Sequence, residues 1–177
     1  MKILNLYAGL GGNRKGFGNN HEITAVEMEQ KIADVYKANF PNDKVVVGDA
    51  NQYLLDHSDE FDFIWTSPPC PTHSKSRFAR RDTTTPAFPD LKLYEEIIFL
   101  KHNFKGKYVV ENVIPYYEPL IPAKKRGRHL YWTNFNLPNN LNERKGGIME
   151  GKNEMNRWCE FHNIDLSSYK GTQRKDK

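Results

Sequence analysis

The chain has few cysteines and no long apolar segment. Of its 177 residues only Cys70 and Cys159 are cysteine, too few and too far apart for the disulfide framework of small secreted domains. No apolar run approaches the roughly 20 residues of a membrane-spanning helix, and the N-terminus lacks the charged and apolar regions of a signal peptide. We therefore expect a cytoplasmic protein without a membrane segment.

Neither basic nor acidic residues are in great excess. The net charge is +4, from 26 basic and 22 acidic side chains, but residues 61–128 carry 12 basic and 7 acidic ones. A basic middle is compatible with a phosphate-backbone partner. For charge alone, a solvated basic surface is the better explanation.

Short apolar runs that alternate with helical patterns predict an α/β fold. Residues 30–40 and 91–104 have helical spacing of apolar side chains, and Pro41 ends the first of these helices. We expect strands within 2–12, 21–29, 43–50, 60–69, 105–113 and 128–137. Strands interleaved with helices favour a mostly parallel sheet covered on both faces, a Rossmann-like arrangement.

A glycine-rich turn follows the first predicted strand. Gly9, Gly11 and Gly12 allow a sharp turn and a close approach to a ligand, as in nucleotide-binding loops. Arg14 occupies the place of the third glycine of the dinucleotide pattern, so a simple strand-to-helix turn explains the segment about as well.

Acidic residues end the next two predicted strands. Glu27 lies roughly 20 residues beyond the glycines, where a carboxylate binds ribose hydroxyls. Asp49 could accept from an adenine amino group, or it could instead cap the helix that "GDANQYL" predicts. Since the carboxyl ends of parallel strands form the ligand-binding edge of such sheets, these features together predict an adenosyl pocket.

Two further segments, "SPPC" and "ENV", narrow the choice of ligand. Together with the earlier features, they make the chain resemble the cytosine-5 DNA methyltransferases, whose motifs occur here in the same order. The matching segments are "LNLYAGLGG", "AVEMEQKIADVYKANFP", "GDANQY", "SPPCPTHS", "VVENV" and "KKRGRHLYW". The resemblance covers about Lys2 to Phe135. It departs from the family at Tyr7, where Phe is usual, and at Pro71 and Lys124, where Gln is usual.

The resemblance implies a methyltransferase fold, S-adenosylmethionine as cofactor and Cys70 as the nucleophile. A thiolate that adds to carbon 6 of cytosine makes carbon 5 able to attack a sulfonium methyl group. That chemistry requires a thiol of lowered pKa, with Glu111 at the ring nitrogen and Arg126 and Arg128 as cationic donors. The implied cofactor residues are Tyr7, Ala8, Gly9, Gly11, Gly12, Glu27, Asp49 and Pro69.

The resemblance also implies that the partner is double-stranded DNA with the target cytosine flipped out of the stack. In the family the loop after the nucleophile closes over DNA, and its basic residues here would meet phosphates. A mobile surface loop explains each single residue of that loop about equally well. The implied DNA-binding residues are Pro68, Ser74, Lys75, Arg77, Arg80, Arg81 and Asn112.

Three other interpretations remain open. "TSPP" also resembles amino-directed DNA methyltransferases, although Cys70 stands where those enzymes place an aromatic residue, and "ENV" has no role in them. A non-catalytic methyltransferase-like protein would not need Cys70, Glu111 and Arg128 together. Cys70-x-x-His73 and Cys159-x-x-His162 share the spacing of zinc ligands, but the pairs are far apart, so we expect no metal. His21, His57, His102 and His129 follow no pattern and are expected at the surface.

We expect a catalytic domain over residues 1–138 and a polar tail over 139–177, with one possible helix at Met155 to His162. The 49 residues after Arg128 resemble neither the family's target-recognition region nor its late cofactor motif. The sequence therefore predicts either a minimal enzyme of a phage or bacterial type, or a chain cut short. For this chain alone we expect weak cofactor binding, salt-dependent and largely non-specific DNA binding, and slow catalysis.

Overall fold

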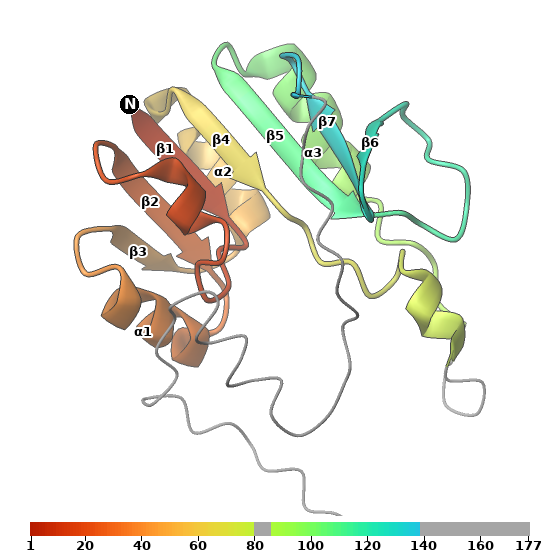
Figure 1. Ribbon diagram of the computed structural model, residues 1–177, viewed down its shortest axis with the longest axis horizontal. Helices are drawn as coiled ribbons and strands as arrows, with labels where there is room; N and C mark the ends of the chain where they lie inside the picture. The colour runs from red at the N-terminus through yellow and green to blue at the C-terminus, as the bar shows by residue number, and fades with distance from the viewer. Residues whose placement is uncertain (80–85, 139–177) are drawn as a thin grey trace, which may run out of the picture.

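The structure, a computed structural model, describes residues 1–79 and 86–138. Seven strands form one sheet in the order β3-β2-β1-β4-β5-β7-β6 (Figure 1). Strands β1 to β5 run parallel, whereas β7 is antiparallel to both β5 and β6. The strands are β1 (Lys2–Leu6), β2 (Glu22–Glu27), β3 (Lys44–Val47), β4 (Phe63–Thr66), β5 (Lys107–Val113), β6 (Lys124–Arg126) and β7 (His129–Thr133).

Helices lie on both faces of the sheet. The three α-helices are α1 (Gln30–Asn39), α2 (Ala50–His57) and α3 (Lys92–Asn103), and three short 3-10 helices are η1 (Arg14–Phe17), η2 (Ser58–Glu60) and η3 (Lys75–Ala79). In the view of Figure 1, α2 and α3 lie behind the strands and α1 lies beside β2 and β3. None of the helices in the described ranges is both long and apolar enough to cross a membrane.

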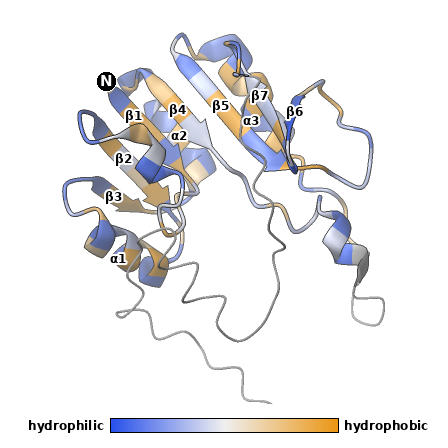
Figure 2. Ribbon diagram, in the orientation of Figure 1, coloured by the Kyte–Doolittle hydropathy of each residue, from blue (hydrophilic) through white to orange (hydrophobic). Residues whose placement is uncertain are grey.

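The larger core lies between the sheet and the helices α2 and α3. Its strand side includes Leu6, Ile64 and Val110, and Leu54 and Leu100 pack on them from the two helices. A smaller cluster on the other face joins Ala8 and Ala25 to Tyr36 of α1. Figure 2 shows the apolar residues concentrated in the strands and the hydrophilic ones in many of the turns. Burial of these faces drives the assembly of the sheet.

The sequence predicted this architecture except at one edge. The mostly parallel sheet with helices on both faces is confirmed. The strand expected within 128–137 is β7, whereas the short strand β6 before it was not predicted. Gly127, with a φ of +54°, provides the tight turn between them.

Arg14 has a structural role that explains why it replaces a glycine. Its side chain is buried, and Nε lies 2.6 Å from Oδ2 of Asp43 while Nη2 donates to Oδ1 at 3.0 Å. Its guanidinium also lies 5.2 Å from the centre of the Phe40 ring. This two-point ion pair connects the glycine-rich turn to the segment before β3.

Candidate functional site

The turn after β1 has an unusual backbone. Tyr7 has a φ of +53°, and it is the one non-glycine residue with positive φ in the described part of the chain. Gly9 and Gly11 follow with φ of +54° and +86°. A Cβ atom on Gly11 would lie 2.3 Å from Cε2 of Phe40. Both this steric clash and the positive φ require glycine at this position. Gly12 has open space around it, and Ala8 is buried.

Glu27, at the end of β2, binds the backbone around the glycine turn. Its Oε2 accepts the backbone N–H of Gly9 at 3.0 Å, and its Oε1 accepts that of Glu29 at the same distance. The carboxylate therefore fixes the turn against β2. Each oxygen keeps one further lone pair with which it can accept from a ligand.

Asp49, after β3, has one of the two roles that the sequence left open, because it caps a helix. Its Oδ1 accepts from the backbone N–H groups of Asn51 and Gln52, at 2.8 and 3.1 Å, and so caps α2. Asp49 also lines a pocket beside Tyr7. Since both capping bonds use Oδ1, Oδ2 is available to a ligand.

This pocket has a volume of about 180 Å³ and lies at the carboxyl edge of the sheet. It brings together Tyr7, Asp49, Pro68 and Pro69, all of which the sequence predicted as binding residues. The glycines, Ala8 and Glu27 are not part of its lining, although Glu27 holds the turn beside it. The full lining is Tyr7, Met28, Asp49, Pro68, Pro69, His73, Asp90, Lys92 and Leu93.

Cys70 lies in the turn that follows β4. Its carbonyl oxygen accepts the backbone N–H groups of His73 and Ser74, at 2.9 and 3.0 Å. The buried Asn112 of β5 donates from Nδ2 to the carbonyl oxygen of Pro68 at 2.9 Å. The turn is thereby bound to the neighbouring strand, and the partly exposed thiol lies at the strand end.

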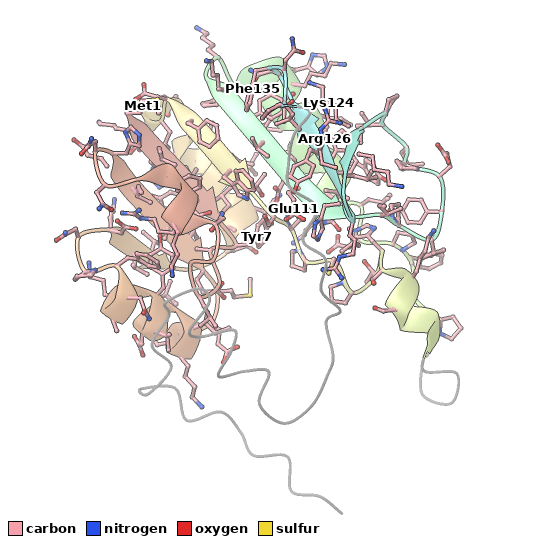
Figure 3. All side chains as sticks on the ribbon, in the orientation of Figure 1. Met1, Tyr7, Glu111, Lys124, Arg126 and Phe135 are labelled. Carbon is pink, nitrogen blue, oxygen red and sulfur yellow. The ribbon has the colours of Figure 1, made fainter. Side chains whose placement is uncertain are left out.

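Glu111 lies on β5, next to the strand that leads to Cys70. Figure 3 shows Glu111 and Tyr7 near the lower, carboxyl-terminal ends of their strands. The Glu111 side chain is 20% exposed, and its Oε1 lies 3.5 Å from Nε2 of His129. The His129 side chain is 41% exposed, as expected for a surface residue, and it also contacts a predicted catalytic carboxylate.

The expected lowering of the Cys70 pKa is wrong for the protein without ligands. Burial raises the pKa of the Cys70 thiol, and the negative charge of Glu111 raises it further. The physical reason is that neither Arg126 nor Arg128 acts on the pKa of this thiol. Without ligands, Cys70 is a protonated thiol at neutral pH.

The two predicted arginines lie at the β6–β7 hairpin. Arg126 donates from Nε to the carbonyl oxygen of Pro138 and from Nη1 to that of Lys125. Arg128 is exposed in the turn. The strand register aligns Arg126 with His129, and His129 with Val113 of β5, so this hairpin reaches the same edge as Glu111.

The basic segment after Cys70 is described in part. Ser74 forms a bridge with Pro115 and its hydroxyl contacts that of Ser76. Lys75 and Arg77 lie on η3. Arg80 and Arg81 lie outside the described residues, as do Cys159, His162 and the predicted helix in the tail.

A metal site receives no support from the geometry. His73 is buried, burial lowers its pKa, and its Nδ1 lies 2.6 Å from the hydroxyl oxygen of Tyr117. Within residues 1–79 and 86–138, no group of three His, Cys, Asp or Glu side chains is placed to hold a metal ion.

Comparison with known proteins identifies the family. A sequence model of the family described as C-5 cytosine-specific DNA methylase matches residues 1–115. The chain belongs to this family. The matched part includes the glycine turn, Asp49, Cys70 and Glu111, so the resemblance inferred from the motifs is confirmed.

The similar proteins are longer than this family member. The chain is 30% identical over 122 residues to the type II methyltransferase M1.HphI of Haemophilus parahaemolyticus, which is 64% of this chain and 32% of that protein. It therefore spans about a third of the length of that relative.

The similar solved structures include two with low TM-scores. One is a DNA modification methyltransferase encoded within a prophage of E. coli, with a TM-score of 0.45, 21% identity, and coverage of 67% of this chain and 33% of that one. The other is a mutant DNMT2 of Spodoptera frugiperda, with a TM-score of 0.43, 28% identity, and coverage of 63% and 35%.

Several residues of this methylase-family site were not predicted from the sequence. Met28, His73, Asp90, Lys92 and Leu93 line the pocket without belonging to a motif that indicated them. Of these, Met28 could have been found, because it directly follows Glu27 at a strand end. The others lie on the connection to α3 or at its start, and their proximity to Tyr7 depends on the tertiary fold.

Proposed function

We propose that this chain carries a cytosine-5 methyltransferase active site, which transfers a methyl group from S-adenosylmethionine to carbon 5 of a cytosine in DNA. One observation carries the proposal: in a member of the C-5 cytosine-specific DNA methylase family, Cys70 and Glu111 stand at adjacent parallel strand ends, beside a pocket lined by Tyr7 and Asp49. Open α/β sheets bind their ligands at this edge.

The pocket residues fit an adenosyl ligand. Met28, Leu93 and the ring of Tyr7 supply apolar surface for a flat heterocycle, and Oδ2 of Asp49 can accept from its amino group. Glu27 holds Gly9 and can accept from a ribose hydroxyl at the rim. S-adenosylmethionine, when bound, supplies a methyl group on a sulfonium sulfur.

The raised pKa of Cys70 suggests how base binding starts the reaction. The charge of Glu111 disfavours the thiolate in the free protein. When Glu111 and the ring nitrogen of a bound cytosine share one proton taken up from water, that charge is reduced and the thiol loses its own proton to water more easily. The Cys70 sulfur would then bond to carbon 6, and the electron pair of the C5–C6 double bond would bond to the methyl carbon as the bond of that carbon to the sulfonium sulfur breaks, which leaves S-adenosylhomocysteine. Loss of the carbon 5 proton to water and departure of the Cys70 sulfur as a thiolate would restore the ring.

The target cytosine must leave the stack to reach Cys70, because carbon 6 is inaccessible within a duplex. Lys75 and Arg77 on η3, together with Arg80 and Arg81, are proposed to contact phosphates of double-stranded DNA. Arg126 and Arg128 are proposed to approach the base from the β6–β7 hairpin, and Asn112 to keep the Pro68 carbonyl in place.

The test is methyl transfer with identification of the product. The chain is incubated with S-adenosylmethionine carrying a labelled methyl group and with duplex DNA of mixed sequence, and the nucleosides are then separated. We expect label in 5-methylcytosine, and none with Cys70→Ser. Label on an amino group of cytosine or adenine would establish the amino-directed alternative. Cofactor and DNA binding without transfer would establish the non-catalytic one.

A further inference from the structure

A buried carboxyl group lies directly behind the pocket. Glu96 of α3 is 1% exposed and stands one helical turn after Leu93, which lines the pocket. Its Oε1 accepts from the hydroxyl group of Tyr7, and its Oε2 accepts from that of Thr66 at 2.7 Å. Nδ2 of Asn51 lies 3.5 Å from Oε1, at the outer limit for a hydrogen bond. One side chain thus connects the turn after β1 with β4, α2 and α3.

The hydrogen bond to Glu96 gives a role to the hydroxyl group of Tyr7, at a position where the family usually has phenylalanine. Tyr7 has left-handed backbone geometry, which is unfavourable for a residue with a large side chain. Its hydroxyl is bonded to Glu96 inside the protein, so the ring is what it presents to the pocket. Burial, followed by the charge of Glu96, raises the pKa of Tyr7, and the phenol remains a hydrogen-bond donor at neutral pH.

Within the part of the chain that the structure describes, no cation contacts the Glu96 carboxyl group. Tyr7, Thr66 and Asn51 all donate to it, and an apolar replacement of Tyr7 would remove the donor that connects it to the pocket. Loss of one partner from a buried polar pair costs more than the pair contributes, because the remaining group stays desolvated.

We propose that Glu96 is a positioning residue of the cofactor pocket: it fixes the Tyr7 ring as one wall and anchors Asn51 beside Asp49. The inference rests on the proposed function, since it assumes that the pocket binds the adenosyl group. Glu96 itself does not line the pocket, so its effect on binding passes through Tyr7 and Asn51.

The fold contains a matched pair that serves as a control. Tyr36 is fully buried and donates from its hydroxyl to Oδ2 of Asp43 at 2.8 Å. Neither residue lines the pocket. Tyr36→Phe keeps the ring against Ala8 and leaves Asp43 paired with Arg14, so it removes only a buried tyrosine–carboxylate hydrogen bond away from the pocket lining and reports the effect of such a loss on stability.

The experiment measures the Kd for S-adenosylhomocysteine by calorimetry, together with the Tm of each variant. We expect Tyr7→Phe and Glu96→Gln each to raise the Kd on the order of three- to tenfold, the range that one hydrogen bond supports. The double variant should be little worse than either single one, because both remove the same contact. Tyr36→Phe should lower the Tm and leave the Kd unchanged.

Two results would overturn the inference. If Tyr7→Phe and Glu96→Gln lower the Tm as Tyr36→Phe does but leave the Kd at the wild-type value, Glu96 is structural only. If the two effects on the Kd are fully additive, the contact between the two side chains does not transmit the effect. Absence of binding by the wild-type chain is a different outcome, which would reject the proposed function and this inference together.

Discussion

Asn112 of β5 donates a hydrogen bond from Nδ2 to the carbonyl oxygen of Pro68, 2.9 Å away, and thereby binds the turn that carries Cys70 to the strand that carries Glu111. Its own Oδ1 accepts the backbone N–H of Val113 at 2.9 Å. The amide thus has a structural explanation that is separate from any contact with DNA. It fixes the relative position of the two groups that the proposed chemistry requires.

We predict that Asn112→Ala lowers the free energy of unfolding by about 1–3 kcal/mol, because it leaves buried polar groups without partners. Urea denaturation measures this change. Asn103→Ala is the matched control, since Asn103 also donates from Nδ2 to a carbonyl oxygen, that of Phe99, but at an exposed position. Equal effects of the two substitutions would show that the Pro68 contact has no special importance.

Cys70 should react slowly with iodoacetamide at pH 7.5, because burial and Glu111 raise its pKa. Its rate should rise as the pH increases above the ordinary range of a thiol. Glu111→Gln removes a negative charge, lowers the thiol pKa and should make alkylation at pH 7.5 faster. Mass spectrometry of the Cys70 peptide gives the rate separately from that of Cys159.

Glu118→Gln is the control for this charge effect, because Glu118 is an exposed carboxylate in the segment after β5. It should leave the Cys70 rate unchanged. Slower alkylation in Glu111→Gln would mean that Glu111 assists ionisation of the Cys70 thiol in the free protein, whereas its negative charge is expected to oppose that ionisation.

We predict that Gly11→Ala destabilises the protein and Gly12→Ala does not. At Gly11 the new Cβ would lie 2.3 Å from Phe40 and the residue would keep a φ of +86°, whereas nothing lies within 4 Å of a Cβ on Gly12. We expect a loss of roughly 1–3 kcal/mol at Gly11 from backbone strain. Thermal unfolding compares the two variants, and equal Tm values would contradict the assigned turn geometry.

Glu96 should make stability depend on pH. Burial raises its pKa, and Asp49 raises it further, while the donors Tyr7, Thr66 and Asn51 lower it. A carboxyl group with a raised pKa in the folded state stabilises most below its ordinary pKa. That stabilisation is lost as the pH rises through the ordinary value toward the folded one.

The wild-type protein should therefore lose stability relative to Glu96→Gln as the pH rises from about 4, where an ordinary glutamate begins to ionise. The measurement is the free energy of unfolding of both proteins across this range. Glu95→Gln, at an exposed neighbouring position on α3, should follow the wild-type curve. A constant difference between wild type and Glu96→Gln would show that Glu96 does not titrate differently on folding.

The order of motifs and the apolar periodicity were sufficient to predict the sheet, the pocket edge and the family. Gly11, Asp49 and Cys70 could be placed because each directly follows a strand, and strand ends meet at one edge. Glu111 was found through the resemblance of "VVENV" to a family motif, and the structure places it on the strand next to the one that leads to Cys70.

The contacts made through tertiary packing could not be predicted. Glu96 appeared as one of several residues in an amphipathic helix, and nothing local indicates that it meets Tyr7, which is 89 positions away. The direction of the Cys70 pKa depended on burial and on which charges approach the thiol, which only the folded geometry specifies. His129 likewise became relevant only when β7 paired with β5.

The central claim, that Cys70 bonds covalently to cytosine, is tested most directly by trapping on 5-fluorocytosine. Duplex DNA with fluorine at carbon 5 of every cytosine is incubated with the chain and S-adenosylmethionine, and the product is denatured and mapped by mass spectrometry. Fluorine cannot leave as the proton does, so we predict a denaturation-resistant complex joined through the Cys70 peptide and absent in Cys70→Ser. A complex that persists in Cys70→Ser, or the absence of any complex although cofactor and DNA bind, would contradict the account.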